Sequence, residues 1–270
     1  MGTEEVINEI GWILMLPYLL FFFFHILTRA TLVCTPYFVT ATILYTCGSI
    51  YMFATAHWNA LPTIVWQYLF YQFFLPSLSL LMSINRFTAV IWWNQYSRIW
   101  KWKFFVLYSS IILVITLTLH YMFYKALFNC TYCVSNNRNL YRVFKTTVYI
   151  TAFLVEVCAV LCRQKLKSKH TLDKYDVMLL MQSLLSTSCF LVNIGCNQVF
   201  DALAADNILK PIVQFISNCM FVMGFHLPCL YVFIKNKQLR YLLFKFYFIN
   251  KFWKTEFTTV QVSALSQTYY

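Results

Sequence analysis

Charged residues, glycine and proline are all scarce in this 270-residue sequence. Asp, Glu, Lys and Arg together make up 11% of the residues, and there are 5 Gly and 6 Pro, whereas a soluble domain carries about 25% charged residues. So little charge cannot cover the surface of a soluble globule, and it also excludes a disordered chain. Instead, 60% of the residues are hydrophobic, 20% are aromatic, and the mean hydropathy is +0.62. The composition predicts a protein surrounded mostly by lipid.

Long apolar runs recur along the chain at the length that a membrane crossing needs. A hydrocarbon layer about 30 Å thick takes about 20 apolar residues in a helix, and a helix pairs its backbone groups within its own segment. Seven windows meet this requirement: 10–27, 32–56, 62–84, 104–124, 146–162, 177–200 and 211–234. The sequence therefore predicts an all-α membrane protein, a seven-transmembrane helix bundle over 10–234.

The basic residues divide unevenly between the segments that join these windows. Lys and Arg concentrate on the cytoplasmic side of membrane proteins. With the N-terminus outside, 16 of the 21 lie in the inner segments 28–31, 85–103, 163–176 and 235–270. The outer segments hold Lys125, Arg138, Arg142, Lys145 and Lys210. We therefore expect an extracellular N-terminal tail, 1–9, and we attribute the net charge of +12 to contact with an anionic leaflet, not with nucleic acid.

Three further features lie in the predicted outer and inner segments. The only Asn-x-Ser/Thr sequon begins at Asn129, in an outer segment, which makes Asn129 a candidate glycosylation site. After the seventh window, apolar residues recur at helical spacing among bases: Leu239, Leu242, Leu243 and Phe246. They predict a short amphipathic helix on the cytoplasmic membrane surface within 235–254. The polar stretch 255–270 is predicted to be a disordered cytoplasmic tail.

Polar side chains inside the windows are expected to face the interior of the bundle, because hydrocarbon disfavours them. In the outer halves of three windows they are candidates to line a ligand pocket that opens outward. These candidate ligand-binding residues are Tyr68, Gln72, Asn193, Asn197, Gln214 and Asn218. Hydrogen bonds between helices, with no ligand involved, explain the same residues, so both interpretations stay open.

Glu156 is the only acidic residue within a window. An unpaired carboxylate in hydrocarbon is costly, so Glu156 is expected to be protonated or paired. Arg86, at the inner end of a polar stripe on the third helix, is one candidate partner, and Arg163 on its own helix is another. We hypothesise an Arg86–Glu156 latch.

Nothing in the sequence indicates an enzyme. The five His residues are scattered, no two carboxylates lie together within the windows, and there is no Gly-rich phosphate loop. We therefore expect no catalytic residue, no metal site and no cofactor.

Short motifs give most of the chain a resemblance to a known family. The third window closes with Ser83-Ile84-Asn85-Arg86-Phe87, Tyr96-Ser97-Arg98-Ile99-Trp100 follows, and the seventh window carries Pro228-Cys229-Leu230-Tyr231. With seven spans and an outside N-terminus, the chain resembles the nematode serpentine chemoreceptors, class gamma first and class V next. It departs from the general receptor pattern in three places: Asn85, not an acidic residue, precedes Arg86, no Cys lies at the outer end of the third window, and Leu227 precedes Pro228 in place of Asn.

The resemblance implies a GPCR-like chemosensory receptor in the plasma membrane, in sensory neuron cilia. Such a receptor binds a small external molecule in the outer half of the bundle and signals to a heterotrimeric G protein. The residues assigned to coupling and switching are Asn85, Arg86, Glu156, Pro228 and Tyr231. Two other classes stay open: a seven-helix ligand-gated ion channel, which should have its N-terminus inside, and a multipass transporter, which should show internal repeats.

Overall fold

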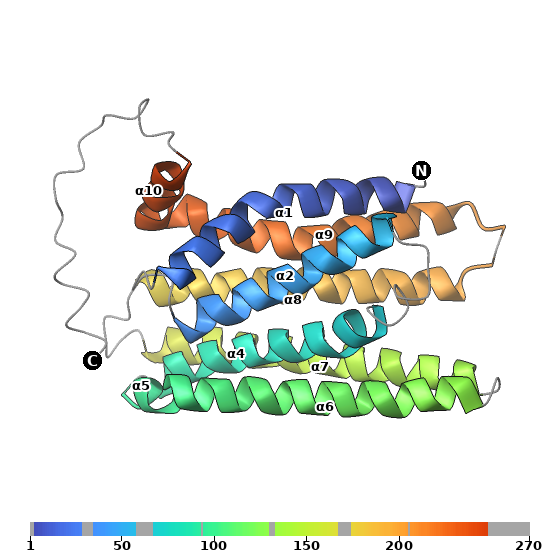
Figure 1. The fold of residues 1–270 in the computed structure, drawn as a ribbon, viewed down its shortest axis with the longest axis horizontal. Coiled ribbons are helices and arrows are strands. Elements are labelled where there is room, and N and C mark those ends of the chain that lie inside the picture. The colour runs from blue at the N-terminus through green and yellow to red at the C-terminus, as the bar shows by residue number, and fades with distance from the viewer. Residues whose placement is uncertain are drawn as a thin grey trace.

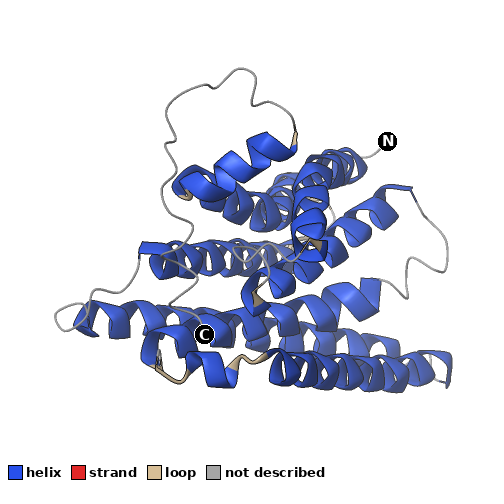
Figure 2. Ribbon diagram, turned by 60° about the vertical axis from the view of Figure 1, so that its left-hand side comes forward, coloured by secondary structure: helices blue, strands red, loops and turns tan. Residues whose placement is uncertain are grey.

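The computed structural model describes residues 3–28, 35–57, 67–92, 94–129, 133–166, 174–204 and 206–247. The side chains of residues 3, 67–70, 123–129, 133–140, 166 and 174–176 lie outside this description. The described part is helical and contains no strand (Figure 2). Its elements are α1 (Thr3–Leu27), α2 (Pro36–His57), η1 (Gln67–Phe74), α4 (Leu75–Ile91), α5 (Tyr96–Ile99), α6 (Trp102–Asn129), α7 (Cys133–Leu166), α8 (Lys174–Ala202), α9 (Leu209–Lys235) and α10 (Lys237–Phe246).

Seven described helices are long and apolar enough to cross a membrane. This finding confirms the predicted all-α bundle of seven transmembrane helices. The long helices run side by side (Figure 1), and the N-terminus of α1 lies at the end of the bundle opposite to α10. We call the end that carries Thr3 the N-terminal end. The side of the membrane that it faces stays a prediction from the basic residues.

Several helices extend beyond the windows that predicted them, and the extensions of α4 and α7 bear on the candidate sites. α4 continues to Ile91, so Asn85 and Arg86, predicted at the end of the third span, lie within the helix. α7 begins at Cys133, and its candidate span is Tyr141–Lys165. The assignment of Arg142 and Lys145 to an outer loop was therefore wrong. A charged side chain interrupts an apolar window but not a helix, because long basic side chains have good helix propensity.

The third span starts with an unusual turn. Residues Gln67–Phe74 form a π-helix, which leads directly into α4 near Pro76. Proline has no N–H to offer the carbonyl four residues before it, and the π-helix ends two residues before this proline. The wide turn, visible where α4 begins in Figure 1, places Tyr71 and Gln72 at the N-terminal end of the bundle.

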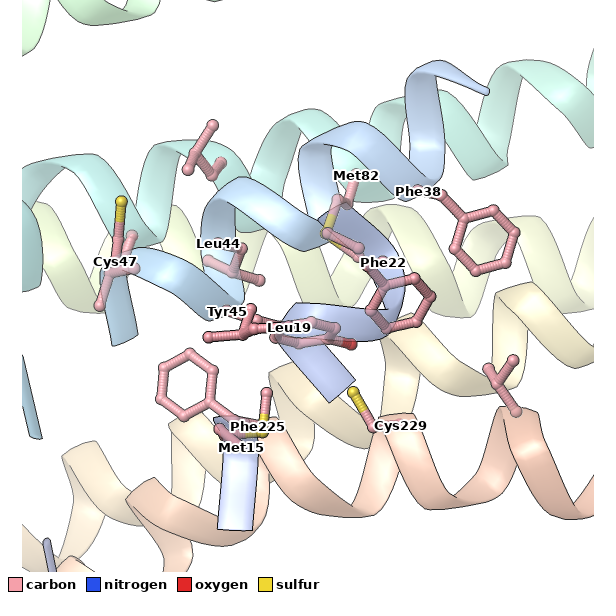
Figure 3. Close-up of a cluster of buried hydrophobic side chains, with 14 of the residues drawn as sticks. Met15, Leu19, Phe22, Phe38, Leu44, Tyr45, Cys47, Met82, Phe225 and Cys229 are labelled. Atoms are coloured by element: carbon pink, nitrogen blue, oxygen red, sulfur yellow. The ribbon is translucent and has the colours of Figure 1, made fainter. Parts of the chain in front are cut away.

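One large apolar core holds the bundle together. Figure 3 shows part of it, with side chains converging from α1 (Met15, Leu19, Phe22), α2 (Phe38, Leu44, Tyr45, Cys47), α4 (Met82) and α9 (Phe225, Cys229). Helices α2 and α9 lie close together at Gly48, where an added Cβ would lie 2.5 Å from the ring of Phe225. In contrast, α6 lies at the edge of the bundle (Figure 1) and exposes an apolar face that includes Val106, Val114 and Met122, as a lipid-facing helix does.

The amphipathic helix predicted after the seventh span is present as α10. The side chain of Asn236 caps its first turn by accepting from the N–H groups of Gln238 and Leu239. The apolar face of α10 packs on the bundle and not outward: Leu239 is fully buried, and the ring of Phe246 lies 5.0 Å from that of Phe24 on α1. The residues from 248 onward, which include the predicted tail 255–270, lie outside the described residues.

The residue after α10 ties this helix to the first span. The Tyr247 hydroxyl donates to the carbonyl of Pro17 at 2.6 Å. Partial burial raises the pKa of the Tyr247 phenol above its ordinary value, so the hydroxyl keeps the proton that it donates.

Candidate functional site

A pocket of about 330 Å³ opens at the N-terminal end of the bundle. Residues of α1, α2, η1, α7, α8 and α9 line it, so almost every helix of the central bundle contributes to its wall. Its volume falls at the lower end of the range for small-molecule sites. The pocket is therefore large enough for a small organic compound.

Four of the six predicted ligand-binding residues line this pocket: Gln72, Asn193, Asn197 and Asn218. Gln214 lies at the rim instead, where its Nε2 donates to Oε2 of Glu4 at 3.4 Å. The side chain of Tyr68 lies outside the described residues. Most of the predicted residues therefore line one pocket, as their spacing on three helices indicated.

Asn193 is the centre of the hydrogen bonds beside the pocket. Its Nδ2 donates to the carbonyl and to Oγ of Ser217 on α9, at 2.9 Å each, and its Oδ1 accepts from the Tyr71 hydroxyl at 3.1 Å. Ser217 in turn donates to Oδ1 of Asn197 at 2.9 Å. Asn193 is thus occupied in joining α8, α9 and η1. Within the described residues, the amides of Gln72 and Asn218 form no hydrogen bond, so they are available to a ligand.

Aromatic rings form one wall of the pocket. The rings of Tyr51 and Tyr71 stack with their centroids 4.7 Å apart, and Phe221 meets both edge-on at 5.3 and 5.2 Å. Phe200 also lines the pocket. Such a wall favours an apolar or aromatic body in the ligand.

Charged groups reach the pocket from three helices. At its rim, Nη2 of Arg142 on α7 lies 2.5 Å from Oδ2 of Asp201 on α8. Glu4 of α1 also lines the pocket, and deeper inside lies Lys145 of α7, with its Nζ 3.5 Å from the centroid of the Tyr71 ring. Three residues of this region were missed by the sequence analysis: Lys145, Tyr71 and Ser217. Lys145 directly precedes the fifth window, Tyr71 precedes Gln72, and Ser217 precedes Asn218. Each missed residue is therefore next to a feature that the sequence analysis had named.

Glu156 lies in a buried polar cluster between α4, α7 and α8. Its Oε1 accepts from the Ser83 hydroxyl at 2.6 Å, its Oε2 accepts from the Thr187 hydroxyl, and the side chain is fully buried. A carboxyl group held by two hydroxyls meets the requirement that a buried polar group be hydrogen-bonded. These two bonds do not involve Arg86, so the Arg86–Glu156 latch stays a prediction.

Arg86 lies near the other end of α4, against the ring of Tyr37. Its Nη2 donates to Oδ1 of Asn85 at 2.9 Å, and its guanidinium carbon lies 3.8 Å from the centroid of the Tyr37 ring. The Tyr37 hydroxyl reaches the carbonyl of Leu179 on α8 at 3.3 Å. Arg86 is buried in this arrangement.

The segment after α4 is fixed against this end of the bundle. The Tyr96 hydroxyl donates to Oδ1 of Asn85 at 3.1 Å, and the indole N–H of Trp100 donates to the hydroxyl of Thr88 at 2.7 Å. Tyr96 and Trp100, from the motif after α4, therefore bind side chains of α4 next to Arg86.

The remaining assigned residues lie in three different surroundings. Pro228 is buried in the middle of α9, and Tyr231 is half-buried nearer the end of that helix. Asn129 is the last residue of α6, and its side chain lies outside the described residues. Among the described residues, no three of His, Cys, Asp and Glu lie close enough together to hold a metal ion.

The sequence matches no known protein-family model and no curated protein. The resemblance to the nematode serpentine chemoreceptors therefore stays a prediction, which rests on the short motifs around Arg86 and Pro228.

Proposed function

We propose that this multipass membrane protein is a GPCR-like chemosensory receptor of the plasma membrane. A small external molecule binds in the pocket at the N-terminal end, and a heterotrimeric G protein binds at the opposite, cytoplasmic end. The resemblance to the nematode serpentine chemoreceptors indicates the membrane of sensory neuron cilia. The proposal has the N-terminus outside, in agreement with the basic residues.

One observation carries this proposal: a single helix, α8, takes part in the three polar sites described above, at the pocket, at Glu156 and at Arg86. Asn193 of α8 forms the hydrogen bonds beside the pocket, Thr187 binds Glu156, and the carbonyl of Leu179 accepts from the tyrosine that lies against the Arg86 guanidinium. A displacement of α8 at the pocket therefore changes the surroundings of the buried acid and of the arginine. This is the physical connection that a receptor requires between its ligand and its partner.

The ligand acts through a difference in affinity. A molecule that fits the pocket better in one arrangement of α8 and α9 shifts the equilibrium toward that arrangement, and only by as much as the two affinities differ. Arg86 is covered in the described arrangement, which therefore corresponds to the resting receptor. In the active receptor, movement of α8 and of Tyr37 uncovers the arginine for the G protein.

The test uses cells that express the protein with an epitope tag at its N-terminus. We expect an antibody to reach the tag on intact cells, and a subset of small apolar compounds to raise intracellular calcium through a co-expressed promiscuous G protein. Arg86→Ala should abolish this response without abolishing ligand binding. Arg98→Ala, at an exposed arginine on α5, is the matched control and should keep the response.

Two results would overturn the proposal. The first is an N-terminal tag that the antibody reaches only after permeabilisation. The second is a ligand-evoked current that persists when the G protein is removed, because such a current indicates a ligand-gated channel.

A further inference from the structure

Lys145 is a buried cation at the pocket wall. Its side chain is only 6% exposed, its Nζ lies over the ring of Tyr71, and it lines the pocket. Tyr71 cannot turn away easily, because its ring stacks on Tyr51 and its hydroxyl donates to Asn193. The ammonium group is therefore held in one place, facing the cavity.

The acids near Lys145 do not neutralise it. In the part of the chain that the structure describes, no carboxylate oxygen lies within 4.0 Å of its Nζ. Asp201 is paired with Arg142 at the rim, and Glu4 is exposed and accepts from Gln214. A buried charge needs a partner of opposite sign, and the face of one tyrosine ring supplies only part of that stabilisation. Among the described residues no carboxylate pairs with Lys145, so an anion that enters the pocket would supply such a partner.

We propose that the ligand of this pocket is a small organic carboxylate with an aromatic or other apolar body, whose carboxylate pairs with Lys145. This inference rests on the proposed function, because it names the class of ligand that the receptor detects. A single negative charge fits best, since Arg142 is paired with Asp201 and a second negative charge would add to the repulsion from Glu4, which also lines the pocket. The rings of Tyr51 and Phe221 accommodate the apolar body, and the free amide of Asn218 is a second donor for the carboxylate.

Binding of matched pairs of probes tests this proposal. The protein is placed in nanodiscs of zwitterionic lipid, and its melting temperature is followed against rising concentrations of benzoate, phenylacetate and 3-phenylpropionate, and of the corresponding primary amides. We expect at least one acid to raise the melting temperature saturably, and its amide to bind at least about 30-fold more weakly, because removing one partner of a buried ion pair costs at least that factor.

Variants assign the effect to Lys145. Lys145→Met should remove the preference for the acid over the amide, and Lys145→Arg should keep it, because the cation is retained. Lys210→Met is the matched control: Lys210 lies at the same end, with its Nζ 4.8 Å from the centroid of the Phe200 ring, but it does not line the pocket. This control should bind the acid as the unmodified protein does. If Lys145→Met does not fold, the comparison of Lys145→Arg with the unmodified protein still decides the matter, since a lost preference in Lys145→Arg counts against the proposal.

Three results would overturn this inference: no acid raises the melting temperature, acids and amides bind equally, or Lys145→Met keeps the preference for the acid. None of them bears on coupling to a G protein. Conversely, an acid that binds through Lys145 but evokes no G-protein response in cells would contradict the receptor proposal and leave the carboxylate site in place.

Discussion

The hydroxyl of Ser186 on α8 donates a hydrogen bond to the carbonyl of Gly224 on α9 at 2.8 Å. Gly224 precedes Pro228 by four residues, so its carbonyl is the one that proline leaves without a helical partner. In hydrocarbon no water replaces that partner. Gly224 also lets α8 come close, because a Cβ there would lie 2.7 Å from the ring of Phe190. The interruption of the α9 hydrogen bonds at Pro228 is thus compensated by the neighbouring helix.

Ser186→Ala should lower the stability of the bundle by about 1–2 kcal/mol, because it leaves the Gly224 carbonyl buried without a donor. The measurement is thermal unfolding of the purified protein in detergent. Ser188→Ala is the control, since that hydroxyl donates to the carbonyl of Leu184 within its own helix, and it should change stability by less than about 0.5 kcal/mol. Equal losses for the two variants would contradict the role assigned to Ser186.

Glu156→Gln should raise basal signalling while it leaves the fold intact. The amide has the size of the carboxyl group, but only its oxygen accepts, so the hydroxyls of Ser83 and Thr187 can no longer both donate to this side chain. The junction of α4, α7 and α8 is therefore weakened. The measurement is G-protein activation without ligand, with Glu9→Gln, at an acidic residue of α1 that contacts His57, as the control. Unchanged basal output together with unchanged stability would refute this role of Glu156.

The number and type of the spans could be predicted because they depend on how many consecutive residues are apolar. Each needs enough consecutive apolar residues to cross hydrocarbon, and the sequence shows that directly. The limits of α7 could not be predicted in the same way, because Arg142 and Lys145 interrupt the apolar window but not the helix. The π-turn before Pro76 also has no signal of its own in a hydropathy pattern.

The candidate site could be predicted only as far as the faces of single helices. Spacing places Asn193 and Asn197 on one face, and they do line the same pocket. Spacing does not show how neighbouring helices are rotated, and that rotation gives Glu156 the hydroxyls of Ser83 and Thr187 as partners. Lys145 was missed for the same reason, because its importance comes from Tyr71 on another helix.

Gly48→Ala should destabilise the protein by about 1–3 kcal/mol, as overpacking a close contact does. The added methyl group would meet the ring of Phe225, which is itself fully buried and in contact with Phe190 and Phe221. Gly195→Ala is the matched control, because nothing lies within 4 Å of the Cβ position there. It should leave stability unchanged or raise it by up to about 1 kcal/mol, the difference in helix propensity. Thermal unfolding of both variants in the same detergent makes the comparison, and a larger loss for Gly195→Ala would refute the close approach of α2 and α9.

Leu239→Ala distinguishes two positions for α10. The sequence predicts that the apolar face of this helix lies on the membrane, whereas the structure buries Leu239 completely among residues of the bundle. In the second case the substitution leaves a cavity and should cost about 2–5 kcal/mol, and it should also speed hydrogen exchange throughout α10. Gln238→Ala, at the exposed neighbouring residue, should cost less than about 0.5 kcal/mol. A Leu239→Ala variant that unfolds at the original temperature would instead mean that lipid, and not the bundle, covers this face.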